Sequence, residues 1–179
     1  MQAREVVRHI REKYGKLIEE AATLYRHRPE VLAGIMMAET EGGLSPCLDK
    51  PGPAGRGDKG HGHGLMQIDD RSFPEFCQSD RWADPKWNIL MGAEVLAGKL
   101  QALRKLTAIH LIYGMEAEDM ERAAIAAYNC GAGRVVQALT EGKDVDAHTA
   151  GKNYSSRVLA AAALYLEEGN GGSDDGKQL

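Results

Sequence analysis

Apolar residues return at helical spacing along most of the chain. Between residues 3 and 27 they recur about every 3.6 residues, which predicts a first amphipathic helix. Pro29 suits the first turn of a second helix, which should run from residue 30 to about residue 41. That second helix is apolar on nearly every side, so we expect it to be buried.

The second half of the chain predicts four more helices. Asp84 and Pro85 supply an N-cap and a first-turn proline for a helix that runs to about Leu106. Three helices follow, at about residues 118–129, 133–139 and 154–167. The pattern therefore indicates a mainly α-helical protein.

A glycine-rich segment separates the second helix from the third. Residues 44–64 are rich in Gly, Pro and Asp, which predicts an irregular loop, and the mainly apolar residues 65–68 predict a short strand of a small β-hairpin. Residues 1–168 are expected to form one domain, in which residues 1–28 contribute the N-terminal helix. Residues 169–179 have the composition of a flexible tail.

The composition of the 179 residues excludes several classes of protein. Hydrophobic residues make up 43%, too many for a chain that is disordered throughout. The longest apolar run is far short of the roughly 20 residues of a membrane span, so we expect no membrane insertion. The net charge of −4, with acids and bases interspersed, leaves no basic stripe for a nucleic acid. Three widely spaced cysteines indicate neither a disulfide framework nor a redox pair.

The most informative chemistry lies in one acid and in the segment 57–71. Glu39 is an isolated carboxyl at the end of the apolar second helix, and both desolvation and the helix dipole should raise its pKa. Asp58 and Asp69 lie on a polar, glycine-rich segment, where a carboxylate stays ionised. Glycosidic cleavage by inversion needs this pair of states, an acid for the leaving oxygen and a carboxylate that activates water.

Neighbouring charged residues have simpler interpretations. Glu41 is a competitor for the acid role, but the apolar surroundings favour Glu39. Asp70 is expected to be a solvated neighbour, and Arg71 and Arg157 are expected to be solvated or paired with nearby acids.

Two histidines raise the question of a metal. His61 and His63 lie two residues apart, close to several aspartates, and zinc uses both kinds of ligand. Glycines flank both histidines and no distant histidine motif completes a site, so we expect no metal and no cofactor.

Four blocks of sequence follow one another as in the goose-type lysozymes, which belong with the soluble lytic transglycosylases to one lysozyme-like superfamily. The resemblance covers about residues 30–168. The blocks are residues 39–43, 57–71, 127–133 and 151–155. Two positions depart from the family pattern, because Thr40 stands where serine is usual and His63 stands where an aromatic ring is usual.

The resemblance implies a lysozyme-like helical domain with a substrate cleft beside the glycine-rich loop or hairpin. It implies that Glu39 is the proton donor and that Asp58 and Asp69 hold and activate the water. It further implies residues that line the sugar sites or support the acid, namely Gln67, Met66, His63, Tyr128, Asn129 and Tyr154. Tyr128 and Asn129 have a second interpretation, as the end of a helix that is capped at Gly131.

The resulting hypothesis is an inverting muramidase that acts as a monomer on peptidoglycan or a related N-acetylglucosamine polymer. A lytic transglycosylase with 1,6-anhydro products, a chitinase on the same fold and an inactive peptidoglycan-binding module remain as alternatives. The charged first ten residues contain no apolar segment of a secretory signal. We therefore expect synthesis in the cytoplasm and action on the cell wall after export or lysis.

Overall fold

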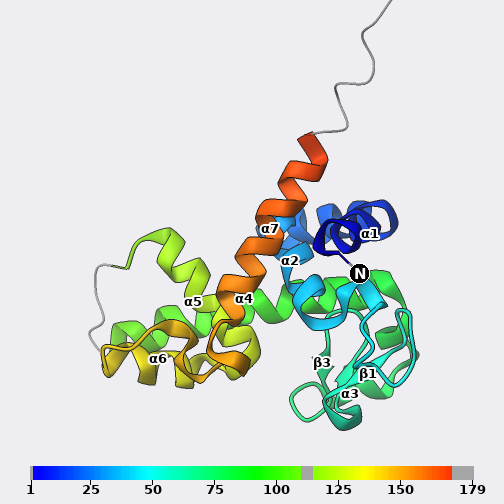
Figure 1. Cartoon of the computed structure of the whole chain (residues 1–179). Helices are drawn as coiled ribbons and strands as arrows, with labels where there is room; N and C mark the ends of the chain where they lie inside the picture. Colours follow the sequence, from blue (N-terminus) through cyan, green and yellow to red (C-terminus); the bar gives the residue numbers. More distant parts are fainter. Residues whose placement is uncertain (1, 110–114, 171–179) are drawn as a thin grey trace, which may run out of the picture.

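The computed structural model describes residues 2–109 and 115–170, and helices dominate it (Figure 1). The helices are α1 (Ala3–Tyr25), α2 (Pro29–Thr40), α3 (Pro74–Gln78), α4 (Pro85–Ile109), α5 (Ala117–Cys130), α6 (Ala132–Thr140) and α7 (Tyr154–Asn170). Short 3-10 turns join them, namely η1 (Glu41–Gly43), η2 (Asp58–Gly60), η3 (Asp80–Ala83), η4 (Val145–His148) and η5 (Ala150–Lys152). The mainly α-helical class predicted from the sequence is confirmed.

Helix α7 crosses the molecule, with α5 and α6 on one side and α1 with the small sheet on the other (Figure 1). It packs against α1, α2 and α5, while α4 packs against α1 and also against α5 and α6. None of the helices in the described residues combines the length and the apolarity that a membrane span requires.

Helix α2 is the central element of the core, as its sequence predicts. The side chains of Leu32, Ile35 and Met36 are fully buried. Gly34 allows the backbones of α2 and α7 to approach closely, because a Cβ at this position would lie 2.4 Å from the carbonyl oxygen of Val158. The end of α2, and with it Glu39, is therefore held at a fixed distance from α7.

The glycine-rich segment forms a three-stranded antiparallel sheet of very short strands, β1 (Arg56–Gly57), β2 (Gly62–His63) and β3 (Ile68–Asp69), in the order β1-β2-β3. The strand predicted at residues 65–68 is wrong for all but Ile68. Gly64 and Gln67 have positive φ angles of 75° and 48°, so the chain reverses direction between β2 and β3.

Helix ends follow their local signals closely. The Asp84 carboxylate accepts hydrogen bonds from the backbone N–H groups of Lys86 and Trp87, at 2.8 and 3.3 Å, and so caps α4 as predicted. Helix α7 continues to Asn170, so the predicted tail begins two residues too early. The other residues of the predicted tail, 171–179, lie outside the described residues.

Candidate active site

A cavity of about 470 Å³ lies between the sheet and helices α4 and α5, at the end of α2. The three acids predicted from the sequence, Glu39, Asp58 and Asp69, all line it. Of the other predicted site residues, Gln67, Tyr128 and Asn129 also line this cavity. Glu41, the competing acid, does not line it and instead lines a separate cavity beside α1 and α7.

Glu39 lies in the last turn of α2 and is partly buried. Burial raises the pKa of its carboxyl to about 7, although a hydrogen bond from Tyr154 and the charge of Arg157 both oppose the increase. The Tyr154 hydroxyl donates to Glu39 Oε1 at 2.5 Å. Arg157 donates to the carbonyl oxygen of Ala38 at 3.1 Å. Near neutral pH a large fraction of Glu39 is therefore protonated and able to donate a proton.

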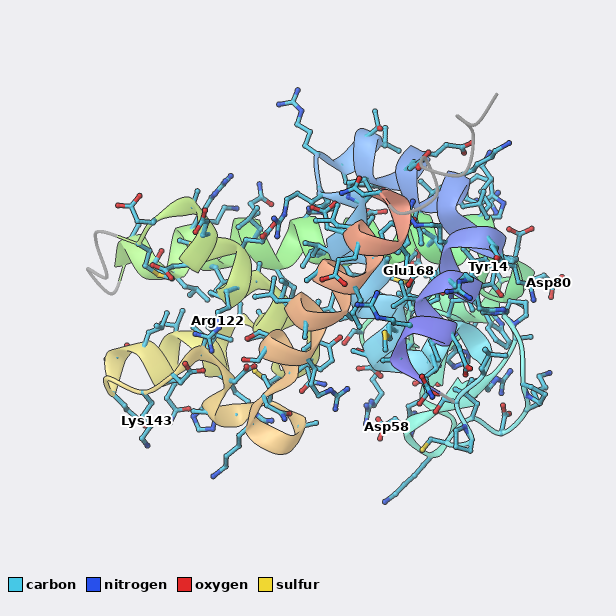
Figure 2. All side chains as sticks on the ribbon, turned by 45° about the horizontal axis from the view of Figure 1, so that its top comes forward. Tyr14, Asp58, Asp80, Arg122, Lys143 and Glu168 are labelled. Carbon is cyan, nitrogen blue, oxygen red and sulfur yellow. The ribbon has the colours of Figure 1, made fainter. Side chains whose placement is uncertain are left out.

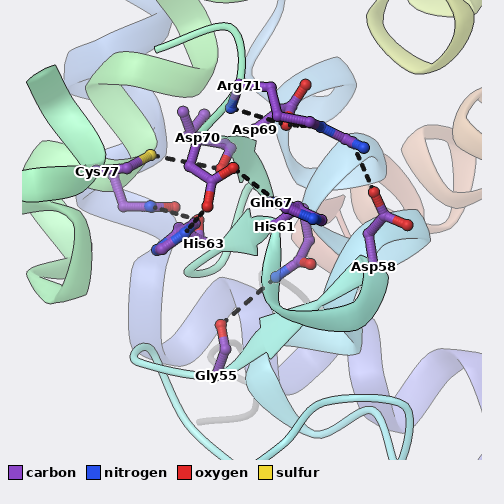
Figure 3. A network of polar contacts seen from close by, with 11 residues as sticks. Gly55, Asp58, His61, His63, Gln67, Asp69, Asp70, Arg71 and Cys77 are labelled. Carbon is purple, nitrogen blue, oxygen red and sulfur yellow. Dashed lines mark hydrogen bonds and ion pairs between the residues drawn. The ribbon is translucent and has the colours of Figure 1, made fainter. Parts of the chain in front are cut away.

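Arg71 joins the two aspartates of the cavity (Figure 3). Its Nε donates to Asp69 Oδ1 at 2.8 Å, and its Nη2 donates to Asp58 Oδ2 at 2.7 Å. Partial burial by itself would raise the pKa of Asp69, but hydrogen bonds from Arg71 and Ser72 outweigh it and lower this pKa. Asp58 extends outward from the ribbon and is largely exposed (Figure 2). The cavity thus combines a carboxyl group of raised pKa with two carboxylates that are oriented by one guanidinium.

Gln67 lies in the turn between β2 and β3, where its Nε2 donates to the carbonyl oxygen of Gly64 at 2.8 Å. Its Oε1 occupies space that two of the glycines leave open. A Cβ at Gly57 or Gly62 would lie 2.4 or 2.3 Å from this atom. A side chain at either glycine would therefore displace the end of the Gln67 side chain from this position.

The turn that carries Gln67 is held by three side chains from three helices. Thr40 of α2 donates to the carbonyl oxygen of Leu65 at 2.8 Å, and Tyr128 of α5 donates to that of Met66 at 2.8 Å. Asn88 of α4 accepts from the Met66 N–H at 2.8 Å and donates to the carbonyl oxygen of His63 at 3.0 Å. Asn88 was missed in the sequence, where it looked like a residue of the first turn of a helix.

Three predicted substrate contacts lie behind the cavity. Met66, His63 and Tyr154 have exposed fractions of 0%, 4% and 2%, and none of them lines the cavity. Met66 packs closely over Gly92 of α4, and His63 meets the Trp82 ring edge-on with 4.8 Å between ring centroids. All three side chains support residues around the cavity, and Tyr154 contacts the predicted acid directly through its hydrogen bond to Glu39.

Asp70 is not the solvated neighbour that we expected, since it bridges the two histidines (Figure 3). Its carboxylate oxygens lie 2.9 Å from His61 Nδ1 and 3.2 Å from His63 Nε2. These hydrogen bonds lower the pKa of Asp70. Within residues 2–109 and 115–170 no cluster of His, Cys, Asp and Glu is suited to a metal ion.

Tyr154 owes its position to a buried acid that sequence analysis missed. Asp146 accepts from the backbone N–H and the hydroxyl of Ser155, at 2.9 and 2.6 Å, and from the hydroxyl of Thr149 at 3.1 Å. These contacts hold the first turn of α7, where Tyr154 is the first residue. On the cavity wall, Asn129 Oδ1 accepts from the Ala150 N–H at 2.9 Å, so the predicted end of α5 is tied to the start of η5.

Comparison with known proteins identifies the family of the chain. The sequence model of the family described as Lysozyme g matches residues 4–169. The chain belongs to the lysozyme g family. The match includes α1, which lies outside the region of resemblance found in the sequence blocks. Family membership makes the protein a glycoside hydrolase of the lysozyme type.

Two curated relatives illustrate the distance within the family. Lysozyme g of Cyprinus carpio is 30% identical over 160 residues, which cover 88% of this chain and 75% of the relative. Lysozyme g of Struthio camelus is 28% identical over 158 residues, which cover 88% of this chain and 68% of the relative. The similarity thus extends over nearly the whole chain at modest identity.

Proposed function

We propose that this lysozyme g family member is an inverting muramidase. Its substrate is peptidoglycan, in which it cleaves the β-1,4 bond between N-acetylmuramic acid and N-acetylglucosamine. The observation that carries the proposal is the contrast in one cavity between Glu39, whose pKa is raised to about 7, and Asp69, whose pKa is lowered. Two carboxyl groups in opposite states are what acid-assisted hydrolysis by a water molecule requires.

Glu39 is the general acid of this proposal. Its proton passes to the glycosidic oxygen as the bond to the anomeric carbon breaks, and Glu39 becomes a carboxylate. The Tyr154 hydroxyl, which already donates to Glu39 Oε1 at 2.5 Å, stabilises that carboxylate as its charge develops.

Asp58 and Asp69 hold and activate the water. Arg71 occupies Asp58 Oδ2 and Asp69 Oδ1, so the carboxylate groups are fixed relative to each other. Asp58 Oδ1 accepts no hydrogen bond within the described part of the chain, and it is therefore the oxygen that is free to take the proton of the attacking water. Asp69, held at a low pKa, contributes negative charge and orientation.

The two aspartates favour hydrolysis over the lytic transglycosylase reaction. In that reaction the 6-hydroxyl of the sugar attacks, and no second carboxylate is needed. The intact acid Glu39 and its partners in the cavity favour an enzyme over an inactive binding module. We propose that the protein acts on the cell wall as a monomer and without a cofactor.

Mass spectrometry of the fragments released from purified peptidoglycan tests the proposal. Wild type and Glu41→Gln should release reducing-end muropeptides, whereas Glu39→Gln should release almost none. Fragments lighter by one water would identify a transglycosylase instead. Activity retained in Glu39→Gln would remove Glu39 from its role, and release by no variant would leave chitin cleavage or a binding module.

A double substitution tests the role of the two aspartates. Asp58→Asn with Asp69→Asn should suppress hydrolysis more than either single change, because each aspartate partly supports the water when the other is neutral. Full activity of the double variant would refute the assigned role of both residues.

A further inference from the structure

The cavity contains a second cation, Lys99, that has no partner among residues 2–109 and 115–170. Lys99 extends from α4, is partly buried and lines the cavity together with the three acids. No hydrogen bond or ion pair to its ammonium group occurs within those ranges. The other cation of the cavity, Arg71, is bound to both Asp58 and Asp69. Among the described residues that line the cavity, Lys99 alone therefore offers an unpaired positive charge to a ligand.

The surroundings of Lys99 strengthen its attraction for an anion. Val95 lies one helical turn before it, is buried and lines the same cavity, as does the partly buried Cys130 of α5. Burial raises the pKa of the Cys130 thiol, and the charge of Lys99 is close enough to oppose that increase. An ammonium group against such a wall is less screened than one on the open surface, so its interaction with an anion is stronger.

The substrate of the proposed function carries a matching anion. Every second sugar of peptidoglycan bears a lactyl substituent whose carboxyl group is either free or extended by a stem peptide with its own carboxylates. Chitin, the uncharged competitor for this cleft, has no such group. An ammonium on a flexible stem suits a carboxylate whose position varies, because its three donors rotate and act as a point charge.

We propose that Lys99 binds a carboxylate of the muramyl residue and so makes the cavity select peptidoglycan over uncharged N-acetylglucosamine polymers. This inference rests on the proposed function, since it names the group of that substrate which the site recognises. Lys99 acts in binding and takes no part in proton transfer.

Lys99→Met keeps the length of the side chain and removes its charge, and Lys99→Arg retains the charge. The matched control is Lys105→Met, which removes an exposed charge from the same helix away from the cavity. Three soluble ligands serve as probes: glycan strands with stem peptides, the same strands stripped of peptide, and the uncharged hexamer of N-acetylglucosamine. Rates are measured on the two kinds of strand, and the hexamer is measured as a competitor.

For Lys99→Met we expect about a tenfold fall in kcat/KM on carboxylate-bearing strands (about 1.4 kcal/mol), mainly through KM. The inhibition constant of the uncharged hexamer should not change. Added salt should lower the kcat/KM of wild type and leave that of Lys99→Met nearly unchanged. Salt screens the interaction between charges, and Lys99→Met lacks the charge. Lys99→Arg should retain most of the wild-type kcat/KM because it keeps the charge, and Lys105→Met should behave as wild type. A fall in kcat/KM confined to peptide-bearing strands would identify a peptide carboxylate as the group that Lys99 binds. A fall on the stripped strands would identify the lactyl carboxylate.

Two outcomes would overturn the inference: unchanged kcat/KM of Lys99→Met on both kinds of strand, or an equal loss of affinity for the uncharged hexamer. Failure of the proposed function has a different signature, because wild type itself would then release no fragments from either strand. In that event calorimetric binding of the stripped strands to wild type and to Lys99→Met still decides the role of Lys99.

Discussion

The phenol oxygen of Tyr154 lies 2.5 Å from Oε1 of Glu39 and donates a hydrogen bond to it. Burial raises the pKa of Glu39 to about 7, and this hydrogen bond limits the increase because it stabilises the ionised carboxylate. The position of one tyrosine therefore helps to set the pH at which the acid of the cavity loses its proton.

Tyr154→Phe should move the alkaline limb of the activity profile to higher pH. A general acid works only while it is protonated, so activity falls as the pH rises through the pKa of Glu39. Removing the donor raises that pKa further, by about one unit if the hydrogen bond to the charged group contributes about 1.5 kcal/mol. The measurement is kcat/KM against pH.

Tyr128→Phe is the control. The Tyr128 hydroxyl donates to the carbonyl oxygen of Met66 and not to Glu39, so the alkaline limb of this variant should stay in place. An unshifted limb in Tyr154→Phe would show that the hydrogen bond does not tune Glu39.

Glu39→Gln should change how stability depends on pH. The pKa of Glu39 is raised from 4.5 to about 7 in the folded protein, so between these values the unfolded chain loses its proton while the folded protein keeps it. The contribution of Glu39 to stability is therefore lost as the pH rises from about 4.5 to 7, and the total is about 3 kcal/mol. Relative to wild type, the glutamine variant should become more stable by this amount between pH 4 and pH 8. Urea unfolding at both pH values measures the difference, and a constant difference would contradict the raised pKa.

The helices could be predicted because their signals are local. Pro29 and the pair Gly42-Gly43 mark the ends of α2, and Asp84 with Pro85 marks the start of α4. The sheet could not be predicted in the same way, since each strand has two residues and hydrophobic alternation needs at least four. Its shape depends on positive φ angles at Gly64 and Gln67, and the φ of Gln67 is not foreseeable from its residue type.

The acids of the site could be predicted, but not the network that supports them. The placement of Glu39, Asp58 and Asp69 on one cavity follows from their sequence context and from the resemblance to lysozymes. Asn88 and Asp146 contact residues that are distant in sequence, and neither has a flanking motif that marks such a partner. Side-chain networks of this kind are decided by tertiary packing.

Gly62→Ala should reduce activity more than stability. The new Cβ would lie 2.3 Å from Gln67 Oε1, so the Gln67 side chain must leave its position in the cavity wall. Because that side chain borders the proposed substrate cleft, we expect about a tenfold or greater loss of kcat/KM, equivalent to at least about 1.4 kcal/mol. Gly98→Ala is the control, since nothing lies within 4 Å of a Cβ there and alanine favours the helix by about 1 kcal/mol. Near-normal kcat/KM in Gly62→Ala would mean that the position of Gln67 is unimportant for turnover.

Asn88→Ala tests whether the turn at residues 63–66 must be held for the reaction to proceed. The side chain is fully buried, and its loss leaves the Met66 N–H and the carbonyl oxygen of His63 without this partner. We expect a loss of about 2–4 kcal/mol in the free energy of unfolding, and a fall in kcat of the protein that remains folded. Urea unfolding gives the first quantity and initial rates at saturating substrate give the second.

Thr107→Ala provides the comparison for Asn88→Ala. Thr107 is also a buried polar residue of α4, but within the described residues its hydroxyl donates only to the carbonyl oxygens of Leu103 and Arg104 in its own helix. The Thr107→Ala variant should lose some free energy of unfolding and keep the wild-type kcat. Asn88→Asp adds a second test, because it keeps the acceptor for Met66 but places a carboxylate oxygen against the carbonyl of His63. We expect Asn88→Asp to regain stability at low pH, where protonation restores a donor. If Asn88→Ala and Thr107→Ala lower kcat equally, Asn88 stabilises α4 in general and does not position the turn.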